Sequence, residues 1–263
     1  MLPHTFCVDK SAVAAAFSRA ADSYDAVAGF QRRCGEKILS QLNNLSGLKV
    51  LDAGCGTGVF SREFRRAGAH VISLDLAEGM LEKSRILDSA EQYLLADIEH
   101  IPLPDHSVDL CFSNLAIQWC GSLGSALAEM SRVVKPGGKV AFSTLAQGSL
   151  TELAQAWQQV DGQTHVNQFL AFDAIKLACE PFSHDLQLTH ETEFYPDVIT
   201  LMKSLKGIGA THIHQGRNSG LTSRGRFAQL ARVYPQQAEG LPLSYQLRSE
   251  ERRVGKECRS RWS

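Results

Sequence analysis

The chain has 263 residues, 44% of them hydrophobic, and a formal net charge of -1 at pH 7. This length and composition suit one α/β domain with a sizeable core, and the near-neutral charge argues against nucleic acid or an anionic membrane as a partner. The seven cysteines show no CxxC or other paired spacing, so we expect neither a metal site nor a disulfide framework, and a reducing, cytoplasmic environment.

The first part of the chain predicts helices. The opening residues, MLPHTFCVDK, contain no basic-then-apolar signal, and no apolar run in the sequence reaches the length of a membrane span. From 10 to 42, apolar residues such as Val13, Phe17, Tyr24 and Ile38 recur at helical spacing. This pattern predicts one or two helices ahead of the first strand.

The middle of the chain alternates between strand-like and helical segments. Strand-like runs occur at 48–53, 69–76, 92–97, 108–114 and 138–145, and helical patterns occur at 59–68 and 123–135. Such alternation predicts a parallel sheet with helices on both faces.

The order of elements is looser after residue 145. We predict helices at 148–160, 197–208 and 221–234, and strands near 186–194 and 241–247, with a polar turn at 211–220. Repeats and low-complexity linkers are absent from the sequence, so we treat 1–247 as a single domain.

A glycine-rich stretch, VLDAGCGTGVF, follows the first predicted strand. Gly54, Gly56 and Gly58 form GxGxG, but Val59 stands where a dinucleotide-binding loop would carry its third glycine, which disfavours NAD. Asp52 at the strand end would repel a pyrophosphate but suits an ammonium or a sulfonium group. The stretch therefore favours a cationic ligand, although glycines here can also serve only a tight turn.

Two further acidic residues follow the next predicted strands. Asp75 follows the glycines in the sequence by about the number of residues that separates a glycine-rich loop from the carboxylate that accepts the two ribose hydroxyls of a nucleoside. Asp97, with Ile98 beside it, is suited to read an adenine, whereas each carboxylate alone could be a helix cap. A cofactor with a ribose, an adenine, an amino acid and a cationic sulfur is S-adenosylmethionine.

Four sequence stretches resemble the successive motifs of the class I S-adenosylmethionine-dependent methyltransferases: VLDAGCGTG, SLDLAEGML, LLADIEHIPLPDHSVDLCFSNLAIQW and EMSRVVKPGGKVAFST. The resemblance implies a Rossmann-like fold with a mostly parallel seven-stranded sheet and an antiparallel last strand. It also implies cofactor contacts at Leu76 and Asn114. In these terms 10–42 is a helical lid, 48–145 the cofactor-binding half and 146–247 the substrate-side half.

Four other stretches, AAAFSRAADSYD, NLAIQWCG, LAQGSLTELAQAWQQVDG and MKSLKGIGATHIHQGR, resemble the malonyl-[acyl-carrier protein] O-methyltransferases of biotin synthesis. That resemblance implies conversion of the free carboxylate of a malonyl thioester to its methyl ester. It also implies an acyl-carrier protein as partner. Because the nucleophile is already an anion, we expect a clamp and a lid rather than a strong general base.

A basic stretch between 200 and 235 fits such a partner, because carrier proteins are acidic. It contains no Asp or Glu and six basic residues, which are Lys203, Lys206, Arg217, Arg224, Arg226 and Arg232. We predict that Arg217 holds the malonyl carboxylate through two parallel hydrogen bonds. Lys203, Lys206, Arg224 and Arg226 are the predicted carrier contacts, and the alternative is that these residues form the solvated faces of two ordinary helices.

Three aromatic or amide residues complete the predicted catalytic set. Tyr24, in the helical lid, would reach the cofactor or the carboxylate, but a core tyrosine on an amphipathic helix is common. Gln118 would donate to an acyl oxygen and Trp119 would wall the pocket, and the alternative for Trp119 is simple packing. His212 and His214 do not have metal-ligand spacing.

The chain ends on RSEERRVGKECRSRWS, 248–263, which lacks alternation and an apolar face. We interpret it as a foreign or vector-derived tail that cuts the last strand short and leaves neighbouring backbone groups unpaired, and the alternative is a genuine basic tail. Other interpretations of the whole chain are a methyltransferase for a neutral small molecule such as a quinone precursor, a non-catalytic S-adenosylmethionine-binding module and, least favoured, a dehydrogenase.

Overall fold

The computed structural model describes residues 8–180, 184–209 and 224–254, and the side chains at 184–186, 224 and 250–253 are excepted. Its described strands form one seven-stranded sheet. They are β1 (Lys49–Ala53), β2 (His70–Asp75), β3 (Gln92–Leu95), β4 (Val108–Asn114), β5 (Val134–Leu145), β6 (His184–Tyr195) and β7 (Leu241–Arg253).

The strand order is β3-β2-β1-β4-β5-β7-β6. Strands β1 to β5 pair in parallel, and β7 runs antiparallel to both of its neighbours, β5 and β6. This confirms the predicted mostly parallel sheet with an antiparallel last strand. The order reverses at β1, which lies between β2 and β4, and in doubly wound sheets ligands bind at the carboxyl ends of the strands at such a point.

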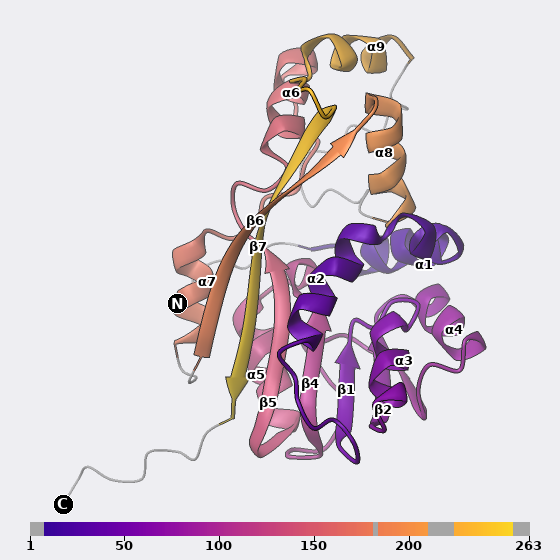
Figure 1. Ribbon diagram of the computed structural model, residues 1–263, viewed down its shortest axis with the longest axis vertical. Helices are drawn as coiled ribbons and strands as arrows, with labels where there is room; N and C mark the ends of the chain where they lie inside the picture. The colour runs from indigo at the N-terminus through magenta and orange to yellow at the C-terminus, as the bar shows by residue number, and fades with distance from the viewer. Residues whose placement is uncertain (1–7, 181–183, 210–223, 255–263) are drawn as a thin grey trace, which may run out of the picture.

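Helices cover both faces of the sheet (Figure 1). Core side chains of α5 and α7 pack against one face, and those of α2 and α3 pack against the other. The described helices are α1 (Lys10–Val27), α2 (Gly29–Leu39), α3 (Val59–Arg66), α4 (Glu78–Ile86), α5 (Leu123–Val133), α6 (Thr151–Asp161), α7 (Phe172–Cys179), α8 (Val198–Gly207), α9 (Arg224–Val233) and a 3-10 turn, η1 (Ile117–Trp119).

The predicted 10–42 region forms two helices, α1 and α2. Asp9 caps α1 by accepting a hydrogen bond from the backbone N–H of Ala12. Two helices, α4 and α7, were not among the predicted elements. Each is short, and α4 begins within SLDLAEGML, a stretch that was matched to a methyltransferase motif without a helix being predicted for it.

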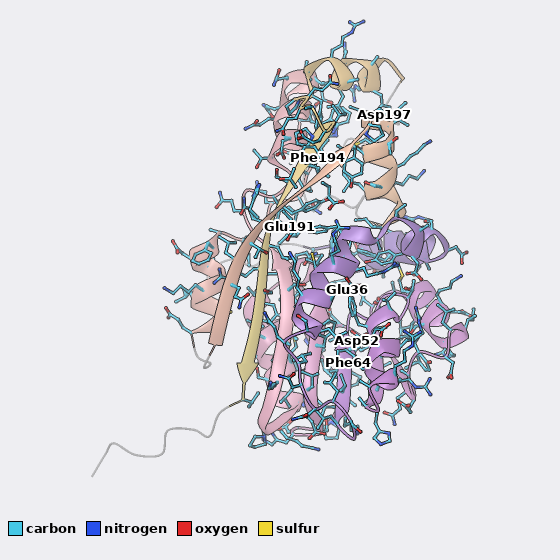
Figure 2. All side chains as sticks on the ribbon, in the orientation of Figure 1. Glu36, Asp52, Phe64, Glu191, Phe194 and Asp197 are labelled. Atoms are coloured by element: carbon cyan, nitrogen blue, oxygen red, sulfur yellow. The ribbon has the colours of Figure 1, made fainter. Side chains whose placement is uncertain are left out.

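Strands β6 and β7 extend beyond the rest of the sheet and carry α6, α8 and α9 above the carboxyl ends of β1 and β4 (Figure 1). Figure 2 shows Phe194 and Asp197 in this upper part, whereas Asp52 and Phe64 lie in the lower part, among the first strands and helices. The chain therefore builds one layer of strand ends and a second layer of helices above it, and α1 runs between the two.

The prediction that the last strand stops near Leu247 is wrong. The backbone of β7 continues to Arg253, and pairs with β5 from Leu145 to Lys139 and with β6 as far as His184. Sheet hydrogen bonds are made by the backbone, so a strand flanked by two long neighbours propagates without the apolar alternation on which the prediction relied.

No helix in the described part of the chain is both long and apolar enough to cross a membrane.

Candidate active site

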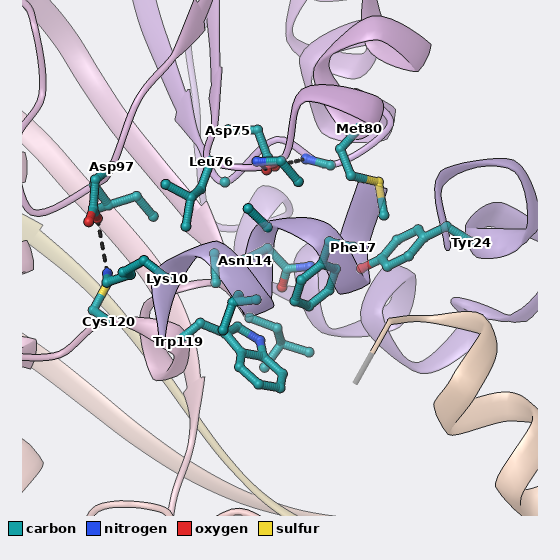
Figure 3. Close-up of a pocket in the computed structure, with 18 residues that line it drawn as sticks. Lys10, Phe17, Tyr24, Asp75, Leu76, Met80, Asp97, Asn114, Trp119 and Cys120 are labelled. Atoms are coloured by element: carbon teal, nitrogen blue, oxygen red, sulfur yellow. Dashed lines mark hydrogen bonds and ion pairs between the residues drawn. The ribbon is translucent and has the colours of Figure 1, made fainter. Parts of the chain in front are cut away.

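A cavity of about 630 Å³ lies where the carboxyl ends of β1, β2 and β4 meet, beneath α1 (Figure 3). We call it the first cavity. Most of the predicted cofactor contacts line it, namely Gly54, Gly56, Asp75, Leu76, Asp97, Ile98 and Asn114, whereas Asp52 and Gly58 do not. Residues from four separate strand ends are thus brought to one place by the reversal of strand order at β1.

The three glycines of the GxGxG stretch have different surroundings, although each has a positive φ. A Cβ atom at Gly54 would lie 2.3 Å from the Ala116 Cβ, and one at Gly58 would lie 2.3 Å from the Ser89 Oγ. A Cβ at Gly56 would meet no atom within 4 Å, because this glycine borders the cavity. Gly58 instead caps α3 and lines neither the first cavity nor the two described below, so the structure shows a packing role for it and its cofactor contact stays a prediction.

Asp75 ends β2 with its carboxylate held by the backbone. Its Oδ2 accepts a hydrogen bond from the Gly56 N–H at 2.8 Å, and its Oδ1 accepts one from the Ala77 N–H at 2.8 Å. Burial raises the pKa of Asp75, and these backbone hydrogen bonds oppose the rise. Each carboxylate oxygen has a second lone pair, so Asp75 can still accept two hydroxyl hydrogens from a ligand.

Asp97 is linked to the beginning of α1. Lys10 Nζ lies 3.1 Å from Asp97 Oδ1 and 2.6 Å from Glu99 Oε2. Cys120 lies close enough to the two carboxylates to share an ion with them, but Lys10 supplies the positive charge there. Burial raises the pKa of the Cys120 thiol to about 12, so it stays neutral. The ion pairs of Lys10 with Asp97 and Glu99 therefore hold the beginning of α1 to the loop after β3. The sequence pattern did not predict this contact.

Asp52 lies in an adjoining cavity of about 440 Å³, which we call the Asp52 cavity. Asp52 is 2% exposed, and its carboxyl group accepts a hydrogen bond from Ser61 Oγ at 2.6 Å. Burial raises the pKa of Asp52 to about 7, and the charge of Asp75 acts in the same direction. A buried acid of this kind is stabilised as an anion when a cationic group binds beside it.

The Asp52 cavity also contains a cationic side chain that was not predicted. Arg32 of α2 borders it, and one guanidinium nitrogen donates to the backbone oxygen of Asp25 at 3.2 Å. Asp25 in turn accepts a hydrogen bond from Thr57 Oγ1 at 2.6 Å, which ties α1 to the glycine loop. A carboxylate and a guanidinium in one small cavity match the two charges of an amino acid. Sequence spacing gave no signal for Arg32, because α2 precedes the loop by many residues.

A third, largely apolar cavity of about 720 Å³ lies between the lid helices and the upper layer. We call it the apolar cavity. It shares Phe17, Tyr24, Leu115 and Trp119 with the first cavity. Phe17 and Trp119 meet edge to face with ring centroids 5.3 Å apart, so they form part of the wall between the two spaces. A group transferred from the first cavity therefore enters an apolar space.

Tyr24 borders all three cavities, and its hydroxyl points into the first one, towards Phe17 and Asn114 (Figure 3). Burial raises the pKa of Tyr24, and the charges of Asp75 and Asp25 add to this, so the phenol remains a neutral donor. Gln118 borders the apolar cavity, but its amide nitrogen donates to the Leu115 backbone oxygen at 2.7 Å. Gln118 is thus placed at the predicted edge, with one donor already engaged.

The remaining predicted residues are on or near α8 and α9. Lys203 and Lys206 are exposed on α8, and Arg232 is exposed on α9. Arg226 is partly buried and lies 3.6 Å from Asp161 of α6, so it is paired within the chain. Arg217, the predicted carboxylate clamp, lies outside the described residues, as does the side chain of Arg224.

These features fit S-adenosylmethionine. Asp75 offers acceptors for a ribose, and Asp52 and Arg32 offer opposite charges for an amino acid. Asp97 and Ile98, the residues predicted to contact the adenine, line the same cavity as Asp75. Residues 51–142 match a family model described as "Methyltransferase domain". The fold and the site together define a class I S-adenosylmethionine-dependent methyltransferase.

Solved structures share this fold at low sequence identity. A putative methyltransferase from Bacillus halodurans C-125 superposes with a TM-score of 0.63 at 14% identity, covering 84% of this chain and 98% of that chain. The YcgJ protein from Bacillus subtilis superposes with a TM-score of 0.61 at 16% identity, covering 86% of this chain and 99% of that chain.

Curated relatives are much more similar in sequence. The chain is 57% identical over 240 residues to the malonyl-[acyl-carrier protein] O-methyltransferase of Yersinia pestis, covering 91% of this chain and 90% of the relative. The protein of the same name from Serratia marcescens is 57% identical, covering 91% and 94%, and that from Salmonella typhimurium is 47% identical, covering 91% and 96%. The chain belongs to the malonyl-[acyl-carrier protein] O-methyltransferase family.

Proposed function

We propose that this protein converts the free carboxylate of malonyl-acyl-carrier protein to its methyl ester, with S-adenosylmethionine as the methyl donor. The observation that carries the proposal is that the apolar cavity shares a wall with the first cavity, where the cofactor is expected to bind. The curated relatives of the chain are named malonyl-[acyl-carrier protein] O-methyltransferase. The ester product would lack the charge that penalises a malonyl group in apolar acyl pockets, which fits the early step of biotin synthesis implied by the sequence resemblance.

Four residues are proposed to hold the cofactor. Asp75 accepts from the ribose hydroxyls, Asp97 accepts from the adenine amino group, Asp52 faces the ammonium group and Arg32 faces the carboxylate. The bound cofactor supplies a methyl group on a positively charged sulfur, which an oxygen anion can accept without prior deprotonation. The protein therefore needs no strong general base at this site.

The chain's own contribution is to place the carboxylate and to remove its water. Phe17, Trp119 and Leu115 line the boundary of the two cavities with apolar surface, and a carboxylate that loses its hydration there becomes a stronger nucleophile. Tyr24 is proposed to donate its phenolic hydrogen to one carboxylate oxygen and so orient the other. Arg217 remains the predicted clamp on the same group.

The carrier protein is proposed to approach over α8 and α9. Lys203 and Lys206 are exposed there, whereas Arg226 is engaged with Asp161 and contributes less to docking. Exposed cations attract an acidic partner over a distance of about one Debye length, which is ~8–10 Å at physiological salt, and mainly raise the association rate.

The test is transfer of labelled methyl from S-adenosylmethionine to malonyl-acyl-carrier protein, with acetyl-acyl-carrier protein as the acceptor lacking a carboxylate. We expect base-labile label on the malonyl carrier alone. Tyr24→Phe should lower kcat about 10- to 100-fold while S-adenosylhomocysteine still binds. Tyr93→Phe, which removes a hydroxyl that accepts a hydrogen bond from the Ala90 N–H, should leave kcat unchanged. A cofactor-binding protein that leaves the malonyl carrier unlabelled but methylates a neutral quinone precursor would overturn the proposal.

A further inference from the structure

The apolar cavity contains an ordered polar pair on the side formed by the segment after α6. His165 borders the cavity and lies outside the part shared with the first cavity. Its Nε2 lies 3.1 Å and 3.0 Å from the two carboxylate oxygens of Asp161. Neither the family model nor the names of the relatives assigns a role to this pair.

The imidazole ring is held in one orientation. It stacks on the indole of Trp157 with ring centroids 4.1 Å apart and an interplanar angle of 23°. The side chains of His165 and Asp161 are 21% and 11% exposed, and Trp157 is 1% exposed. Asp161 is itself anchored, because Arg226 of α9 lies 3.6 Å from its Oδ2. A ring fixed on one face and at one nitrogen cannot rotate freely to follow a ligand.

The Asp161 carboxylate also determines which ring nitrogen can accept a hydrogen bond. An ionised carboxylate only accepts, so the neutral imidazole must carry its hydrogen on Nε2. Nδ1 then presents a lone pair, and within the described residues no hydrogen bond to this atom is found. Most of the other described residues around the cavity are apolar or aromatic, and the exceptions are the side-chain amides of Gln31, Gln118 and Asn167. His165 therefore offers an acceptor in a mostly apolar space.

On the basis of the proposed function, we propose that His165 Nδ1 accepts a hydrogen bond from the pantetheine arm of the substrate, at the amide N–H two methylene groups beyond the thioester sulfur. The malonyl carboxylate has to lie at the boundary near Tyr24 and Trp119, so the arm continues into the part of the cavity where His165 lies. The arm alternates short hydrocarbon segments with secondary amides, which matches a mostly apolar cavity in which His165 offers an oriented acceptor. Asp161 acts as a positioning residue through His165.

The test compares two forms of malonyl-acyl-carrier protein, one with the natural arm and one in which an ester oxygen replaces that amide N–H. At about pH 8.5, where an ordinary imidazole is neutral, we expect the wild-type protein to favour the natural arm about 10-fold in kcat/KM, mainly through KM. His165→Phe keeps a ring for stacking on Trp157 and should lower this ratio to about 1. Asp161→Asn, which no longer fixes the tautomer, should give an intermediate ratio.

His190→Phe is the matched control, since His190 lies on β6 and is bonded to Gln246 and Thr192 away from the cavity, so it should retain the 10-fold ratio. Binding of S-adenosylhomocysteine reports whether each variant is folded. A His165→Phe ratio equal to the wild-type ratio, or no wild-type preference for the natural arm, would overturn the inference while leaving the methyl transfer itself intact. Failure of the wild-type protein to methylate the natural malonyl carrier would instead overturn the proposed function.

Discussion

The first cavity and the apolar cavity are built in different ways. Residues at the carboxyl ends of β1 to β4 form much of the first, and its two carboxylates, Asp75 and Asp97, accept hydrogen bonds from backbone N–H groups. The apolar cavity takes its walls from α1, α2, η1, α6, α8 and β7, which are far apart in the sequence. Most of the cofactor cavity wall therefore comes from short local motifs, whereas the acyl site depends on how the two layers pack.

The largest expected effect concerns two glycines of the same loop. Gly56→Ala should weaken S-adenosylhomocysteine binding about 100-fold with a loss of stability of only about 1 kcal/mol, because its Cβ enters the cavity and meets no protein atom. Gly58→Ala should instead cost about 2–4 kcal/mol of unfolding free energy, because its Cβ overlaps Ser84 and Ser89. Calorimetry and urea unfolding of both variants measure the two effects. If Gly56→Ala and Gly58→Ala lowered the affinity equally and the unfolding free energy equally, Gly56 would have no specific role in binding and Gly58 none in packing.

Asp52 should show opposite effects on stability and binding. Its pKa in the folded protein is raised to about 7, above the value of about 4 for an exposed carboxyl, so the folded state loses stability as pH rises between these values. We expect Asp52→Asn to stabilise the cofactor-free protein by about 1–3 kcal/mol at pH 8 and by much less at pH 5. The same variant should bind S-adenosylhomocysteine about 10-fold more weakly at pH 8.

Urea unfolding at both pH values, with calorimetry at pH 8, measures these changes. A stabilisation that is equal at the two pH values would mean that ionisation of Asp52 is not its cause.

The upper layer should respond to charge at its surface. Replacing Lys203 and Lys206 together by Gln should raise KM for malonyl-acyl-carrier protein about 10-fold at low salt, with less effect at high salt, and leave KM for a small malonyl thioester unchanged. The matched control replaces two exposed cations elsewhere, Lys176 of α7 and Arg85 of α4, by Gln. An equal rise in KM for both double variants would assign the effect to net charge rather than to α8.

The smallest expected effect concerns the end of β7. Arg248 is 3% exposed, and its guanidinium lies 4.1 Å from the ring centroid of Phe172. Burying a charge costs desolvation, so we expect Arg248→Met, of similar length, to raise the unfolding free energy by about 1 kcal/mol. Arg85→Met removes an exposed cation 5.2 Å from the Tyr93 ring and should change it by less than about 0.5 kcal/mol. A clear loss of stability in Arg248→Met would show that this buried cation holds α7 to the sheet.

Much of the cofactor site was predictable from local patterns. Gly54, Gly56, Asp75 and Asp97 all lie at or just after the ends of predicted strands. The carboxyl ends of parallel strands meet at one edge of a sheet, so the convergence of these residues required only the correct fold class. Gly58 was assigned to the cofactor because the pattern alone cannot tell a glycine that borders a ligand from one that packs against two serines.

The sequence by itself determined the alternation of strands and helices, the cofactor class and the family, because each of these depends on residues that are close together in the chain. The tertiary structure decided the rest. Lys10 pairs with Asp97 and Glu99, Arg32 reaches the Asp52 cavity and His165 borders the apolar cavity only after distant segments have packed together. The extension of β7 to Arg253 was likewise decided by backbone pairing with its two neighbours. Contacts between distant segments follow from the packing of the whole chain, and the spacing of residues along the sequence does not reveal them.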